Sequence, residues 1–134
     1  MSSATAKSCP HWELVAALAR GELRGPAQRD VERHLERHRA CREEFRRLTA
    51  GRFPQIENYT IVEQIGKGGF GVVYKAIHHD KERIEALKVL FTKTPLMTSY
   101  FENEVHLIAK LRHPHIATLY DAHLSSEPLY YTME

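Results

Sequence analysis

The chain has 134 residues, of which 43% are hydrophobic and 27% are charged, and its formal net charge at pH 7 is +2. These values are typical of a soluble globular protein with one ordinary domain or two small ones, and the charge is too small to indicate a nucleic-acid partner. No apolar run approaches the roughly 18 residues that span a bilayer, and the N-terminus lacks the apolar stretch of a signal peptide. We therefore expect a cytoplasmic protein with no membrane segment in this chain, while a segment after residue 134 stays open.

Residues 1–51 predict a small all-α module of three short helices. Leucine and valine repeat at helical spacing within residues 11–20, and Gly21 is a typical residue just past a helix end. Pro26 suits the first turn of a second helix, which we expect over residues 26–38. A third short helix is expected over residues 41–48.

Four side chains of this module have the spacing of a zinc site. His34 and His38 are four residues apart on one helix face, and continuing that helix places Cys41 within about 60° of them. Cys9 would complete a tetrahedral set of two thiolates and two imidazoles for Zn²⁺, with His11 as a spare ligand. A segment of about 50 residues buries little apolar surface and often needs a metal for stability. The alternative, in which these are surface histidines and small core cysteines, stays open.

Three glycines lie within six residues, at Gly66, Gly68 and Gly71, in a G-x-G-x-x-G-x-V pattern. They indicate a tight turn whose backbone N–H groups approach a ligand such as a phosphate. In a dinucleotide-binding fold the same pattern opens a helix. Here residues 59–66 and 72–77 are rich in β-branched and aromatic side chains, which predicts two strands joined by the glycines. We expect this hairpin to cover a nucleotide, and a glycine hairpin without a ligand is the alternative.

A lysine and a glutamate are predicted to form an ion pair near this hairpin. Lys88 lies in an apolar run over residues 86–91, within a buried strand that we expect over residues 85–91, and an unpaired lysine there is costly. Glu104 lies sixteen residues later on a predicted helix, on the side of the apolar residues, and an exposed glutamate is the alternative. The apolar residues expected to face the sheet are Phe101, Val105, Ile108 and Leu111.

The remaining predicted elements complete one sheet and one helix. Ser99 and Glu102 have the spacing of a capping box, which would begin the helix. His113-Pro114 would end it, since the residue before a proline disfavours the helical conformation. Residues 117–124 and 129–134 predict two further strands.

Residues 59–134 resemble the small N-terminal lobe of a eukaryotic-like protein kinase of the bacterial serine/threonine type. The resemblance rests on a glycine hairpin, a strand lysine and a helix glutamate in this order and spacing. It implies an α+β fold in which a five-stranded antiparallel sheet packs against one helix. This lobe would follow the helical module of residues 1–51 after a linker over residues 52–58.

The resemblance also implies a role for individual residues. Lys88 would contact the α- and β-phosphates of ATP and Glu104 would orient it, so these two are the expected catalytic residues. The glycine loop would cover the phosphates, and Val73 and Ala86 would line the slot for adenine. The expected nucleotide-binding residues are Ile65, Gly66, Lys67, Gly68, Gly69, Phe70, Gly71, Val73, Ala86, Lys88, Met133 and Glu134.

The chain stops at the position of the kinase hinge. In the family, the catalytic aspartate, the Asp-Phe-Gly motif that binds Mg²⁺ and the activation segment belong to a second lobe. The resemblance implies a parent protein that transfers the γ-phosphate of ATP to hydroxyl groups of a protein substrate. We expect this chain alone to be inactive.

The helical module resembles the zinc-binding domain of anti-sigma factors at Cys9-Pro10, Leu18-x2-Gly21-Glu22-Leu23 and His34-Leu35. That family typically has a cysteine where this chain has His38, an exchange that zinc tolerates. The resemblance implies a regulatory protein partner for residues 1–51. It also leaves a second function open, in which a zinc-type partner-binding protein carries a vestigial or pseudokinase lobe.

Overall fold

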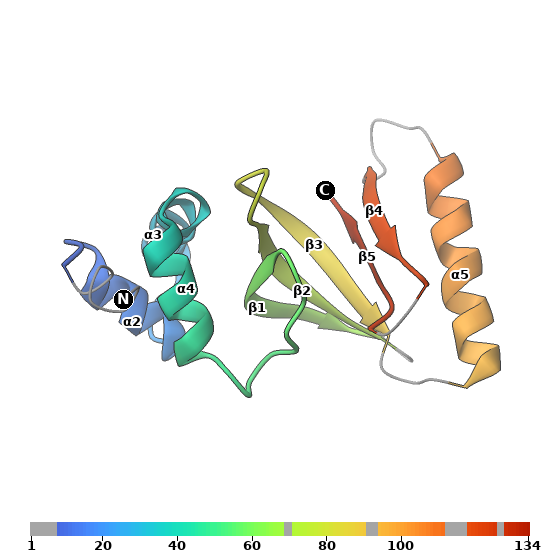
Figure 1. Ribbon diagram of the computed structural model, residues 1–134, viewed down its shortest axis with the longest axis horizontal. Helices are drawn as coiled ribbons and strands as arrows, with labels where there is room; N and C mark the ends of the chain where they lie inside the picture. Colours follow the sequence, from blue (N-terminus) through green and yellow to red (C-terminus); the bar gives the residue numbers. More distant parts are fainter. Residues whose placement is uncertain (1–7, 69–70, 91–93, 112–117, 126–127) are drawn as a thin grey trace. The chain divides into compact units, whose positions relative to one another are not determined.

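The computed structural model describes residues 8–68, 71–90, 94–111, 118–125 and 128–134 (Figure 1). In chain order the elements are α2 (Trp12–Ala19), α3 (Gly25–Arg37), α4 (Arg39–Leu48), β1 (Tyr59–Lys67), β2 (Gly71–His78), β3 (Arg83–Leu90), α5 (Pro95–Lys110), β4 (Leu119–His123) and β5 (Tyr130–Met133). All five predicted strands are present. No helix in the described ranges combines the length and the apolar character needed to cross a membrane.

Contacts between Cα positions divide the chain into two compact units. One comprises Met1–Val62 with Ile77–Arg83, and the other comprises Glu63–Ala76 with Ile84–Glu134. Helices α2, α3 and α4 belong to the first unit, and α5, β4 and β5 belong to the second. The predicted linker at residues 52–58 stays a prediction.

The five strands form one sheet in the order β1-β2-β3-β5-β4. Strand β5 pairs antiparallel with β3 and with β4, and Lys88 of β3 lies opposite Tyr131 of β5. Helix α5 lies beside β4 (Figure 1). Leu90, Phe101, Val105 and Tyr131 form the buried cluster between helix and sheet. This arrangement confirms the predicted α+β class, an antiparallel sheet with one packed helix.

Helix α5 begins earlier than its sequence predicts. The residue that caps it is Thr94, whose hydroxyl accepts a hydrogen bond of 3.2 Å from the Met97 N–H, and Pro95 occupies the first turn. Proline suits that position because its fixed φ matches the helix and its missing N–H has no helical partner. The predicted capping box at Ser99 is therefore wrong. The predicted sheet-facing position of Leu111 is also wrong, because this residue follows the helix and is 51% exposed.

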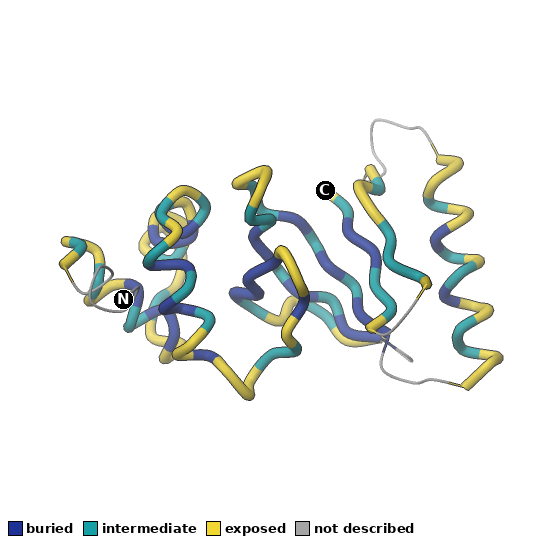
Figure 2. Tube along the Cα trace, in the orientation of Figure 1, coloured by how far each residue is buried: buried dark blue, intermediate teal, exposed yellow. Residues whose placement is uncertain are grey.

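Helices α2, α3 and α4 share a small apolar core. Each helix carries buried positions along one side (Figure 2). The apolar side chains that fill this core are Val15, Leu18, Val31, Leu35 and Phe45. A core of this size supplies little free energy of folding for a segment of about 50 residues.

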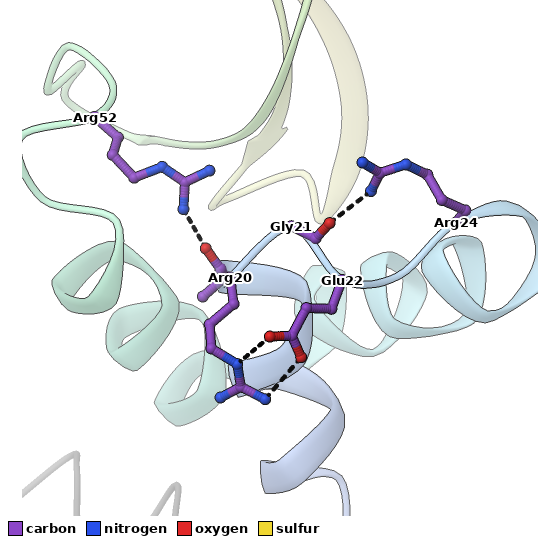
Figure 3. Close-up of polar contacts among 6 residues, drawn as sticks. Arg20, Gly21, Glu22, Arg24 and Arg52 are labelled. Carbon is purple, nitrogen blue, oxygen red and sulfur yellow. Dashed lines mark hydrogen bonds and ion pairs between the residues drawn. The ribbon is translucent and has the colours of Figure 1, made fainter.

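Arginine side chains donate hydrogen bonds to backbone carbonyls at and just after the C-terminal end of α2 (Figure 3). Gly21 follows the helix with φ +76°, a left-handed conformation that suits glycine. The guanidinium of Arg52 donates to the carbonyl of Ala19, and that of Arg24 donates to the carbonyl of Gly21. Arg20 forms an exposed ion pair with Glu22 at 2.8 Å. The arginine donors thus satisfy carbonyls that have no partner inside the helix.

Two adjacent histidines lie where β2 ends, His78 as its last residue and His79 in the turn that follows, and the sequence predicts both as solvated loop residues. His79 contradicts that expectation, since it is half-buried and its Nε2 lies 2.8 Å from the Thr60 hydroxyl. Burial lowers the pKa of His79 to about 4, and the positive charges of Arg42 and Arg46 add to this effect. The ring is therefore neutral in the folded protein at pH 7.

We expect the free energy of unfolding to fall as the pH drops from 6.5 towards 4. In that window the unfolded chain binds a proton at His79 and the folded chain does not, so acid favours unfolding by at most about 1 kcal/mol per pH unit. Urea denaturation at pH 7 and pH 5 measures this slope. His79→Gln can keep the bond to Thr60 but cannot titrate, so its slope should be smaller. An unchanged slope would contradict this assignment.

Candidate functional site

Strand β3 and helix α5 bring Lys88 and Glu104 together. The Lys88 Nζ atom lies 2.8 Å from Oε2 and 3.2 Å from Oε1 of Glu104. The side chains are 19% and 30% exposed, so the pair is partly shielded from water and can still be reached by a ligand. An ammonium held beside a carboxylate in a partly shielded position is a suitable group to contact an anionic ligand.

Tyr131 is a third member of this cluster that sequence reasoning missed. Its hydroxyl donates a hydrogen bond to Oε2 of Glu104, and the Lys88 Nζ atom lies 5.9 Å from the centroid of its ring. Burial, followed by the hydrogen bond and the charge of Glu104, raises the pKa of Tyr131 well above its ordinary value. The phenol is therefore a neutral donor throughout the physiological pH range.

The glycine positions have different structural roles. Gly68 closes the turn, because its N–H donates to the carbonyl of Gly71 at 2.8 Å. A Cβ atom at Gly71 would lie 2.9 Å from the carbonyl oxygen of Val89 and 3.3 Å from Cε of Lys88. The third glycine thus allows β2 to approach the β3 backbone and Lys88 itself.

The first two glycines are not under the same constraint. A Cβ atom would have only ordinary contacts, at 3.8 Å for Gly66 and 3.7 Å for Gly68, and neither residue has a positive φ. Nothing in the fold of the described residues excludes a side chain at these two positions. The predicted binding residues Gly69 and Phe70 lie outside the described residues.

The residues predicted to line an adenine slot lie on neighbouring strands. Val73 of β2, Ala86 of β3 and Met133 of β5 are half-buried, and Ala86 lies opposite Met133 in the register. Strands β2, β3 and β5 are adjacent in the sheet. Apolar side chains that stay partly exposed on adjacent strands form a surface on which a flat aromatic ring can pack.

The predicted residues at the ends of this surface are more exposed. Ile65 is 51% exposed, and Lys67 and Glu134 are also exposed. The backbone N–H of Glu134 donates to the carbonyl of Thr118 at 3.0 Å, which fixes the path of the chain after β5.

The four predicted metal ligands also lie together. Ligand atoms of Cys9, His34, His38 and Cys41 all lie within 4.8 Å of one another. The Cys9 Sγ atom is 3.5 Å from Nε2 of His34, and the rings of His34 and His38 stack at 4.7 Å. Tetrahedral zinc holds such atoms about 3.3 to 3.8 Å apart, so a small contraction would form a site.

The path of the chain to this cluster differs from the prediction. Helix α3 ends at Arg37, and His38 is extended, with φ −107° and ψ 95°, so the expected continuous helix to Cys41 is wrong. His38 instead caps α4, because its Nδ1 accepts a hydrogen bond of 3.3 Å from the Cys41 N–H. Nδ1 has a single lone pair, so a metal ion bound at this atom would replace the hydrogen bond from the Cys41 N–H.

The surroundings of the cluster favour the uncharged forms of Cys41 and His34. Burial raises the pKa of the Cys41 thiol to about 12, with a further contribution from Cys9. Burial also lowers the pKa of His34, and the neighbouring His11 and His38 lower it further. Without a cation the Cys41 thiol stays protonated, whereas a bound cation would stabilise its thiolate.

A comparison with protein families matches residues 59–134 to the protein kinase domain. The chain belongs to the protein kinase family. The matched range begins at the first residue of β1 and contains the glycine hairpin, Lys88, Glu104 and Tyr131. The described part of this kinase domain therefore has the sheet and packed helix of a kinase small lobe.

Curated relatives agree with this assignment. The chain is 36% identical over 81 residues to the serine/threonine-protein kinase ATG1 of Kluyveromyces marxianus and 38% identical over 81 residues to the serine/threonine-protein kinase PknD of Chlamydia pneumoniae. It is 41% identical over 75 residues to the U-box domain-containing protein 70 of Oryza sativa. These matches cover 58%, 58% and 56% of this chain. The chain spans only 10%, 9% and 9% of the lengths of these relatives.

Replacing Gly71 by alanine should destabilise the kinase domain by about 1 to 3 kcal/mol, because the new methyl group would be forced against the Val89 carbonyl. Chemical denaturation of the purified chain measures the effect. Gly66→Ala is the matched control, and its cost should stay well below that of Gly71→Ala. Equal stability of the two variants would show that the close approach of β2 to β3 is not required.

Proposed function

We propose that residues 59–134 are the ATP-binding part of a serine/threonine protein kinase, which transfers the γ-phosphate of ATP to hydroxyl groups of a protein substrate. The observation that carries this proposal is the ion pair of Lys88 with Glu104 next to Gly71, in a chain of the protein kinase family. The named relatives that are serine/threonine-protein kinases support the substrate class.

In this proposal each part of the site has one task. Lys88 donates to α- and β-phosphate oxygens, and Glu104 keeps the ammonium in place for that contact. The hairpin closed by Gly68 and Gly71 offers backbone N–H groups to the phosphates. Val73 and Ala86 pack on the adenine ring, and the residues around them complete the slot.

Phosphoryl transfer needs more than these residues. A bound Mg²⁺ bridges phosphate oxygens and offsets their charge, and we propose that its ligands and the catalytic aspartate lie outside residues 59–134. The 134-residue chain should therefore bind nucleotide without transferring phosphate. A pseudokinase is the alternative within the same family, and it too would bind nucleotide through Lys88.

We also propose that the helical segment of residues 1–51 binds one zinc ion through Cys9, His34, His38 and Cys41. The observation in its favour is the approach of two sulfur and two imidazole ligand atoms to within 4.8 Å. Zinc bound there would cross-link the segment before α2 to α3 and α4. In this role the segment would act as an anti-sigma-like module that binds a regulatory protein, joined to the kinase domain by residues 52–58.

Equilibrium titration of the chain with a fluorescent ATP analogue and Mg²⁺ tests nucleotide binding. We expect saturable binding, displaced by ATP at much lower concentration than by adenosine, because Lys88 and the hairpin contact the phosphates. Absence of saturable binding up to about 5 mM, a very weak affinity, would refute the proposal. Displacement by adenosine as strong as that by ATP would refute the phosphate contacts.

A further inference from the structure

Tyr131 presents a buried polar group to the ion pair. The residue is 4% exposed, and its ring contacts that of Phe101 at 5.4 Å with an interplanar angle of 44°. A hydroxyl buried this deeply needs a hydrogen-bond partner, and the Glu104 carboxylate supplies it. The ring thus belongs to the apolar core, while the hydroxyl belongs to the cluster of charges.

Two different strands hold the same carboxylate. Lys88 of β3 and Tyr131 of β5 are opposite each other in the register, and both donate to Glu104 of α5. A carboxylate has about four acceptor positions, so the two donors can bind at the same time without competition. Lys88 reaches both oxygens, and Tyr131 reaches Oε2.

The second donor changes how firmly Glu104 is fixed. Lysine and glutamate are flexible side chains that lose rotamer entropy when they pair. Tyrosine has two side-chain torsions, and here its ring is already fixed by packing, so its hydroxyl adds a hydrogen bond at little entropic cost. A hydrogen bond to a charged acceptor is stronger than one between neutral groups.

We propose that Tyr131 is a positioning residue for nucleotide binding, which holds the Glu104 carboxylate and through it the Lys88 ammonium in the binding geometry. The pair is then assembled before the nucleotide arrives. Removing only the hydroxyl should let Glu104 and Lys88 sample other rotamers, so part of the binding free energy would be spent on ordering them. This inference rests on the proposed nucleotide-binding function of the site.

The test uses Tyr131→Phe in the 134-residue chain, which keeps the ring and removes the hydroxyl. We expect MgATP to bind about fivefold more weakly, a loss smaller than that of a direct ligand contact. In a Glu104→Ala background the same substitution should leave the affinity unchanged, because Tyr131 acts through Glu104. The matched control is Tyr130→Phe, whose ring stacks on His123 of β4 and whose loss of a hydroxyl should leave the affinity unchanged.

Two results would overturn the inference. One is an affinity of Tyr131→Phe equal to that of the unsubstituted chain. The other is an equal loss in the Glu104→Ala background, which would mean that the hydroxyl acts on the core or on the ligand directly.

A second readout separates this inference from the proposed function. If the unsubstituted chain does not bind nucleotide, the proposed function fails, and a double-mutant cycle of Tyr131→Phe and Glu104→Ala on the unfolding equilibrium then decides whether the Tyr131 hydroxyl holds Glu104. We expect the two effects on the unfolding constant to deviate from multiplicativity by at least about threefold. Independent effects would show that the hydroxyl does not hold Glu104.

Discussion

Replacing Lys88 by methionine is expected to weaken MgATP binding by roughly tenfold to a hundredfold, the range of a hydrogen bond from a charged donor. Two effects add together. The phosphates lose a cationic donor, and the Glu104 carboxylate, which Lys88 contacts at 2.8 Å, is left uncompensated in the site. Methionine has a similar length and no charge, so the substitution removes the ammonium with little change in volume. Titration with a fluorescent ATP analogue measures the loss.

A second substitution tests the electrostatic part of this argument. Glu104→Gln in the Lys88→Met background removes the carboxylate that repels the phosphates, so the double variant should bind MgATP better than Lys88→Met alone. Lys81→Met, at an exposed position in the turn after β2, is the matched control and should bind like the unsubstituted chain. The account fails if Lys88→Met and Lys81→Met bind equally well.

Of the predictions made for this chain, removal of the proposed zinc ion should have the largest effect on stability. A chelator, or Cys41→Ser, is expected to lower the unfolding temperature of the helical segment by more than about 10 °C, since structural zinc supplies much of the folding free energy of small domains. Circular dichroism at 222 nm follows the loss of α2, α3 and α4. Metal analysis of the chain, purified without a histidine tag, should give one equivalent of zinc.

Two controls distinguish a metal site from a packing effect at Cys41, whose side chain is fully buried. His38→Cys keeps four ligands and should keep the zinc, whereas His106→Ala changes an exposed histidine on α5 and should leave zinc and stability unchanged. Less than about a tenth of an equivalent of zinc in the unsubstituted chain would contradict the metal site. The metal site would also be contradicted if a chelator lowered the unfolding temperature of Cys41→Ser as much as that of the unsubstituted chain.

The contact between Lys88 and Glu104 could be predicted from the sequence because each residue breaks a local pattern. A lysine inside an apolar strand and a glutamate on the apolar side of a helix each need a partner. Tyr131 carries no such signal, since a tyrosine is common in a half-buried strand. Tyr131 reaches Glu104 because β5 pairs with β3 as well as with β4, its neighbour in the sequence. That pairing is a property of the sheet order, which the local sequence does not indicate.

The sequence predicts the group of candidate metal ligands from a local helix that is wrong. A continuous helix would place Cys41 on the side of His34 and His38, but the chain leaves helical geometry at His38 and begins α4 immediately. The short break keeps the three residues close. At the beginning of α5 the sequence contains two possible N-terminal caps, Thr94 followed by Pro95 and Ser99 with its capping box. The helix begins after Thr94, so the predicted start at Ser99 is wrong.

The most direct test of the central claim is a crystal structure of this chain with a non-hydrolysable ATP analogue. We predict that the Lys88 Nζ atom lies about 3 Å from an α- or β-phosphate oxygen and keeps its contact with Glu104, under a hairpin closed by Gly68 and Gly71. A nucleotide bound away from Lys88, or a Lys88 side chain turned away from both Glu104 and the phosphates, would contradict the account.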